Sequence, residues 1–91
     1  MLSVKVTWDF VGIAEGFVIR RRIPGSPYAE IARTVLHEYR DTTVEFGKTY
    51  VYGITAYNIA GESTPMVEKS AYVTVPLPPA VTNVETQIIY P

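Results

Sequence analysis

GKTYVYGITAYNIAGES, residues 47–63, alternates between two sets of side chains in its central part. The first set consists of Tyr50, Tyr52, Ile54, Ala56 and Asn58. A period of two is that of a β-strand, because successive side chains of a strand point to opposite faces of the sheet. The segment therefore predicts a long central strand that is closed by a turn at NIAGES.

The same period occurs upstream of this strand. GFVIRRRI, residues 16–23, directs Phe17 and Ile19 inward, and we expect the stem of Arg21 to follow the sheet edge with its charged head in water. LSVKVTWDF, residues 2–10, predicts a half-buried strand whose apolar face is made by Val4, Val6 and Trp8.

Three further segments complete the pattern: YAEIARTV at 28–35, EYRDTTVEF at 38–46 and KSAYVTVP at 69–76. The core contacts expected from them are Ile31, Tyr39, Val44, Ala71, Val73 and Val75. No segment has a helical period. Six short strands, joined by turns rich in Gly, Pro, Asn and Ser, predict an all-β antiparallel sandwich.

Composition limits the classes of function. The 91 residues suit one domain, and a net charge of -1 provides no positive field to attract nucleic acid. No apolar run approaches the roughly 20 residues that span a bilayer, so no membrane insertion is expected. The chain has no cysteine, which excludes disulfides and cysteine-ligated zinc but identifies no compartment.

Catalytic and metal-binding patterns are missing from the sequence. His37 is the single histidine, and the carboxylates are scattered through strands and turns without a calcium-loop spacing. Neither a G-x-S-x-G elbow nor a glycine-rich phosphate loop occurs. We therefore expect no enzyme activity, no cofactor and no metal.

The combined pattern resembles a fibronectin type III domain over residues 2–76. That family carries a tryptophan on its second strand, here Trp8, and a Y-x-Y-x-hydrophobic-x-A-x-N-x-x-G-x-S segment on its sixth, here residues 50–63. The resemblance implies an immunoglobulin-like antiparallel sandwich. It also agrees with a physical role for Tyr50, whose hydroxyl at the start of the strand can bond to upstream backbone in a tyrosine corner.

The chain departs from the family at its first strand. Only three residues precede Val4, so the VKVTW strand is expected to present an open edge that recruits another strand. PLPPAVTNVETQIIYP, residues 76–91, instead resembles a family linker followed by a first strand. We divide the chain into a sandwich, 1–76, and a linker with a C-terminal strand, 77–91. The expected partner-binding residues are Val4, Val6, Val81, Val84, Ile88 and Ile89.

In the family's topology the last strand ends at the pole opposite the start of the first strand. To pair antiparallel within its own chain, the tail would have to cross the length of the sandwich. A linker of five residues spans at most about 17 Å and is too short for this, which favours donation of the tail to a neighbouring chain, head to tail. Two other interpretations stay open. The sequence can be a fragment of a multidomain protein, or the tail can fold back in parallel beside its own edge.

Two surface features suggest other ligands. Arg20 and Arg22 share one face, with Arg33 across a hairpin, and form either an anion-binding patch or a solvated outer face. Tyr28, Tyr57 and Tyr72 would form a carbohydrate platform only if their rings were coplanar, which is the less favoured interpretation.

Two classes of function follow. The first is a structural or protein-interaction module that binds copies of itself or neighbouring subunits, such as an accessory (decoration) protein of a bacteriophage particle. The alternative is an accessory spacer or ligand-binding domain of a secreted enzyme or surface adhesin. The expected location is accordingly a virion or the extracellular surface, and the chain carries no signal-peptide pattern.

Overall fold

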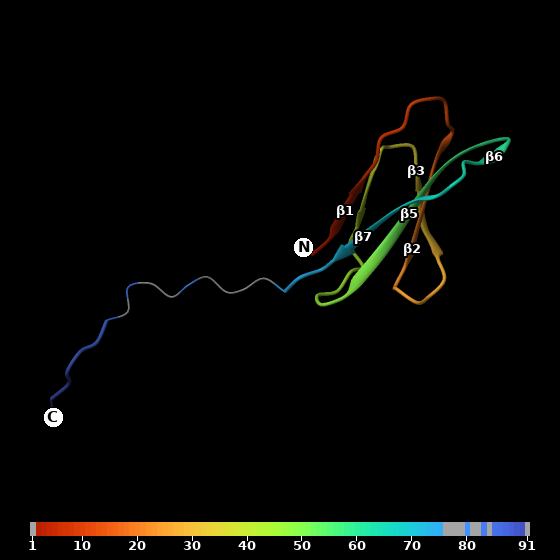
Figure 1. Ribbon diagram of the computed structural model, residues 1–91. Helices are drawn as coiled ribbons and strands as arrows, with labels where there is room; N and C mark the ends of the chain where they lie inside the picture. The colour runs from red at the N-terminus through yellow and green to blue at the C-terminus, as the bar shows by residue number, and fades with distance from the viewer. Residues whose placement is uncertain (1, 76–79, 81–82, 84, 91) are drawn as a thin grey trace.

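The computed structural model describes residues 2–75, 80, 83 and 85–90, and all regular elements within them are strands (Figure 1). No helix occurs in this part of the chain, which confirms the predicted all-β class. In chain order the strands are β1 (Val4–Thr7), β2 (Gly16–Arg22), β3 (Ala29–Thr34), β4 (Glu38–Asp41), β5 (Thr49–Asn58), β6 (Gly61–Glu62) and β7 (Val67–Tyr72).

The strands form two sheets, and every pairing is antiparallel. β1 and β4 make a two-stranded sheet. The second sheet has the order β3-β2-β5, with β6 and β7 both paired to β5. One hydrophobic core contains residues of both sheets, an arrangement consistent with a β-sandwich.

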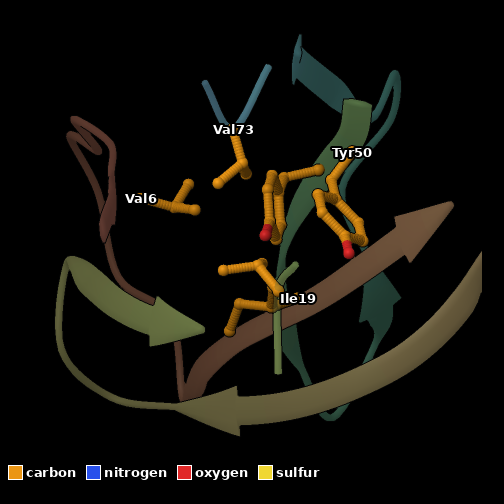
Figure 2. Packing of buried hydrophobic residues seen from close by; sticks show 6 residues of the cluster. Val6, Ile19, Tyr50 and Val73 are labelled. Carbon is orange, nitrogen blue, oxygen red and sulfur yellow. The ribbon is translucent and has the colours of Figure 1, made fainter. Parts of the chain in front are cut away.

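The core lies where the predicted apolar faces meet (Figure 2). Val6 of β1 packs with Ile19 of β2 and with Tyr50 and Tyr52 of β5. The partly buried Val4, Trp8 and Tyr39 pack against this cluster, as their alternation predicts. The buried hydrophobic residues in the described part of the chain are Val6, Phe17, Val18, Ile19, Val44, Tyr50, Val51, Tyr52 and Val73.

The connection into β5 is fixed by Tyr50. Its hydroxyl accepts a hydrogen bond of 2.9 Å from the backbone N–H of Glu45, which is the upstream contact predicted for a tyrosine corner. The same connection contains Gly47 at φ 79°, a backbone conformation that side chains with a Cβ rarely adopt. The Gly47 N–H donates to the carbonyl of Val73, which ties the connection to the residue after β7.

The last strand lies earlier in the sequence than predicted. β7 ends at Tyr72, and Val75, expected on the inner face with Ala71 and Val73, is 66% exposed. The reason is the length of its partner, because β5 begins at Thr49 and offers no ladder beyond that point. Beyond the end of the β5–β7 ladder, the N–H of Val73 donates to the carbonyl of Lys48.

Candidate functional site

The strand β1 has one paired and one unpaired edge. The backbone N–H of Trp8 donates to the carbonyl of His37 on the β4 side, at 3.1 Å. Backbone groups of successive strand residues point to alternate edges, so Lys5 and Thr7 direct their N–H and C=O groups away from β4. Within the described residues no strand pairs with that edge, which leaves donors and acceptors available for strand addition.

Beside this edge lies a groove of about 580 Å³ between β1 and β7, with side chains of β5 also lining it. Its apolar lining includes Val4, Val6, Trp8, Phe17, Ile54, Val67 and Ala71. The groove therefore offers the two kinds of contact that an added strand requires: backbone hydrogen-bonding groups on one side and apolar side chains below. The predicted partner-binding residues Val4 and Val6 both contribute to it.

Trp8, the only tryptophan of the chain, lies at the Thr7 end of the groove. Its ring packs edge-on against Phe17, with 5.4 Å between centroids. The Trp8 Nε1 atom is buried and has no hydrogen-bond partner in the part of the chain that the structure describes. A buried donor without an acceptor typically costs about 1–3 kcal/mol. An extended peptide in the groove carries carbonyl oxygens, the type of acceptor that this donor lacks.

Residues 85–90 lie away from β1 and β7 of their own chain (Figure 1). Residues 85–90 belong to no strand, and the side chains of Ile88 and Ile89 are 75% and 85% exposed. Val81 and Val84, the other predicted partner-binding residues, lie outside the described residues, as does the proposed domain boundary at residue 76.

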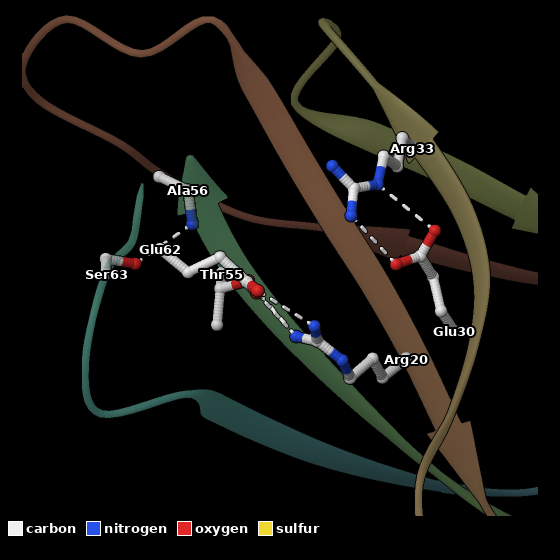
Figure 3. Close-up of polar contacts among 7 residues, drawn as sticks. All are labelled: Arg20, Glu30, Arg33, Thr55, Ala56, Glu62 and Ser63. Atoms are coloured by element: carbon white, nitrogen blue, oxygen red, sulfur yellow. Dashed lines mark hydrogen bonds and ion pairs between the residues drawn. The ribbon is translucent and has the colours of Figure 1, made fainter. Parts of the chain in front are cut away.

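The three arginines of the predicted surface patch each lie beside a carboxylate. Figure 3 shows the pairs made by Arg20 and Arg33. Arg20 contacts both oxygens of Glu62, at 2.7 and 3.0 Å. These bonds, with a further one from Thr55, lower the pKa of Glu62 to about 2. The remaining pairs are Arg33 with Glu30 at 3.1 Å and Arg22 with Glu68 at 3.9 Å. Because each positive charge has a neighbouring negative one, this face is better suited to solvent than to binding an anion.

Arginines also cover two of the three tyrosines considered for carbohydrate binding. The guanidinium of Arg22 lies 5.2 Å from the ring centroid of Tyr28, and that of Arg33 lies 5.0 Å from the ring of Tyr57. A sugar platform requires a bare aromatic face, and in these two rings one face is occupied by a guanidinium.

The alternation pattern gave no indication of the buried charged residue Asp41, which is only 1% exposed. Its Oδ2 atom accepts hydrogen bonds of 2.7 Å from Arg21 and from the Tyr52 hydroxyl. Its Oδ1 atom accepts from the N–H and the hydroxyl of Thr43. The head of Arg21, expected in water, therefore faces this carboxylate. Since all four donors are satisfied together, the cluster has the properties of a structural ion pair between the sheets.

Acid should destabilise the protein through Asp41. Burial alone would raise the pKa of this carboxyl, but hydrogen bonds from Thr43, Tyr52 and Arg21 outweigh burial and lower it from 3.8 to about 2. A lowered pKa in the folded state stabilises above the unfolded-state value, and this stabilisation is lost as pH falls through the folded-state value. Urea unfolding at a series of pH values should show a loss of about 2 kcal/mol from this group between pH 4 and pH 2.

The variant Asp41→Asn carries no titratable group at this position, so the difference between its pH profile and that of the wild type isolates the contribution of Asp41. If the unfolding free energies of the two proteins change in parallel between pH 4 and pH 2, the lowered pKa of Asp41 is contradicted.

Two further features are absent from the residues that the structure describes. No group of three or more His, Cys, Asp or Glu side chains that could hold a metal ion occurs among the described residues. None of these residues forms a helix long and apolar enough to cross a membrane. The sequence matches no protein-family model, and no curated protein shows significant sequence similarity to it.

Proposed function

We propose that this protein is a non-enzymatic structural module that joins neighbouring subunits by accepting a strand at the open edge of β1. The observation that carries the proposal is the combination of an unpaired strand edge with an adjacent apolar groove of about 580 Å³. Addition of an extended segment would satisfy backbone groups of Lys5 and Thr7 and bury the apolar lining at the same time.

We assign the sandwich to the fibronectin type III type. The hydroxyl of Tyr50 bonding to Glu45, the position of Trp8 after β1, and the strand orders β1-β4 and β3-β2-β5 all agree with the sequence resemblance. In that type of domain a further strand pairs with the strand that carries the tryptophan. The groove beside β1 corresponds to the place of this strand.

The occupant that we propose is residues 85–90 of a second copy. In an extended conformation their alternation puts Thr86, Ile88 and Tyr90 on one face and Glu85, Gln87 and Ile89 on the other. The first face is the more apolar and would lie on the groove. Ile88 and Tyr90 are 75% and 78% exposed in the single chain, so burying them in a groove is favourable.

The direction in which the tail leaves the sandwich favours its insertion into a second copy over insertion into its own groove. β1 pairs with β4 through Val4 and Asp41, and Val73 lies beside Lys48 in the connection that follows β4. The tail therefore leaves the sandwich at the end where β1 begins (Figure 1). A strand antiparallel to β1 must instead enter at the Thr7 end. A tail entering its own groove directly would be parallel to β1, the slightly less stable pairing.

Repeated donation would link copies into an assembly. An accessory or decoration protein of a larger particle, such as a bacteriophage virion, is the setting that we propose for such a subunit. This role needs neither a cofactor nor a catalytic site.

The test uses the full chain and two single substitutions in the tail, Ile88→Lys and Ile89→Lys. Both side chains are exposed in the single chain, so neither substitution should unfold the sandwich. Light scattering and thermal unfolding across a protein concentration series should show association and a rising melting temperature for the wild type and for Ile89→Lys. Ile88→Lys should remain monomeric, because its charge would enter an apolar groove.

A synthetic peptide of residues 80–91 provides the second measurement. It should compete with association and change the fluorescence of Trp8, the only tryptophan in the chain. A wild type that stays monomeric at all concentrations, with no response of Trp8 to the peptide, would refute strand donation. The protein would then fit better as a spacer within a larger protein.

A further inference from the structure

The connections between strands gather at the Thr7 end of the sandwich. In the strand register Thr7 lies opposite Glu38, and Gly16 lies opposite Tyr57. The end of β3, at Thr34, lies opposite Phe17. The β1–β2, β3–β4 and β5–β6 connections therefore emerge at one end, as Figure 1 shows.

These three connections expose large aliphatic side chains. Those of Val11, Ile13 and Ile59 are 96–101% exposed, and those of Val35 and Leu36 are 72% and 60% exposed. We call these five residues the apolar pole. Single exposed apolar side chains are ordinary, but a group of them at one end of a small domain is typical of an interaction surface.

The opposite end of the sandwich is also apolar. Ile23, Phe46, Tyr72 and Val75 are 49–66% exposed, and they flank the place where the tail leaves; we call them the exit end. Among the exposed large hydrophobic residues in the described part of the sandwich, the one outside these two groups is Val67, which lines the groove. The exposed apolar surface is therefore concentrated at the two ends.

We propose that the apolar pole binds the exit end of a second copy, so that copies stack head to tail. This proposal rests on the strand donation proposed above. A donor strand antiparallel to β1 enters the groove at the Thr7 end, next to the pole. Nine residues, 76–84, lie between Val75 and Glu85, and this connection spans at most about 35 Å, so the exit end of the donor can reach the pole.

Stacking of unlike ends is a heterologous contact, because the pole of one copy meets the exit end of the next. Such a contact continues from copy to copy and gives a ring or an open filament. A hollow of about 250 Å³ beside Ile13, between the β1–β2 connection and the β5–β6 turn, offers a place for a side chain of the partner.

The experiment compares two full-length double variants. Val11→Lys with Ile59→Lys puts two charges on the pole, whereas Val11→Ile with Ile59→Leu keeps it apolar. Because both original side chains are almost fully exposed, neither change should alter the melting temperature of the dilute monomer. Sedimentation over a concentration series should show association weakened by about tenfold or more for the lysine variant alone.

Binding of the peptide of residues 80–91, followed by Trp8 fluorescence, separates the two proposals. The lysine variant should bind it as the wild type does, because the pole residues Val11 and Ile59 are not part of the groove. If the lysine variant associates as the wild type does while Ile88→Lys does not, strand donation holds and the stacking proposal is wrong. If the lysine variant is weakened but Ile88→Lys associates normally, the head-to-tail arrangement is overturned.

Discussion

Replacing Asp41 by alanine should cost about 3–5 kcal/mol of the free energy of unfolding, the typical cost of breaking a buried ion pair from one side. The carboxylate is 1% exposed and accepts four hydrogen bonds, two at each oxygen. Its removal leaves the buried hydroxyl of Tyr52 without its acceptor and the guanidinium of Arg21 without its ion-pair partner. A domain of this size has a total stability of only roughly 5–10 kcal/mol, so much of it would be lost.

Equilibrium urea unfolding measures this change, and Glu62→Ala is the matched control. Glu62 also holds an arginine at 2.7 Å, but its side chain is 37% exposed. Exposed ion pairs contribute little because water screens them and because both side chains lose conformational freedom. A loss at Asp41 no larger than that at Glu62 would contradict a structural role for the buried cluster.

The second large effect is expected at Ile19. Its side chain is fully buried in the core between the sheets, and Ile19→Ala should reduce the free energy of unfolding by about 2–5 kcal/mol, since it leaves a cavity that the sheets cannot close completely. Ile19→Val removes a single methylene and should cost only about 0.5–1.5 kcal/mol.

Ile59→Ala serves as the exposed control, because its side chain is 97% exposed and makes no core contact. At concentrations where the protein is monomeric, its urea midpoint should equal that of the wild type. Equal midpoints for Ile19→Ala and Ile59→Ala would show that the core is placed wrongly.

Alternation of side chains was sufficient to predict strands in six segments and most of the inner face, although it missed β6 and wrongly put Val75 inside. It put Val6, Ile19, Tyr50 and Tyr52 into one core, and the structure confirms this. The reason is physical: a strand with one buried face has a strict period of two, and a shift by one residue would expose every apolar side chain.

Alternation could not predict burial on the outer face. Val18 is fully buried although it alternates with Ile19, and it lies in register between Arg33 of β3 and Thr55 of β5. Long arginine side chains on that face can cover a neighbour with their apolar stems, as Arg33 covers the Tyr57 ring. Such coverage depends on rotamers and on cross-strand neighbours, neither of which is visible in a single segment.

The candidate site was predicted in part. Sequence spacing identified Val4 and Val6 as residues beside an open edge, and both line the groove. The groove itself depends on β7, whose position the sequence placed too late, and on Val67, which no pattern singled out. Asp41 was missed because its partners Arg21 and Tyr52 come from other strands, and sequence separation hides such contacts.

The topology has a consequence for how quickly the chain folds. β1 must find β4, joining Val4 to Asp41, and β2 must find β5, joining Gly16 to Tyr57. Among the strand pairs of the described residues, only β2 with β3 and β5 with β6 are joined by short turns. Because the ordering cost of these distant pairings is incurred before their contacts form, folding should take milliseconds to seconds rather than microseconds. A newly made chain therefore spends that interval with strand edges exposed, and its yield depends on folding outpacing unproductive pairing between chains.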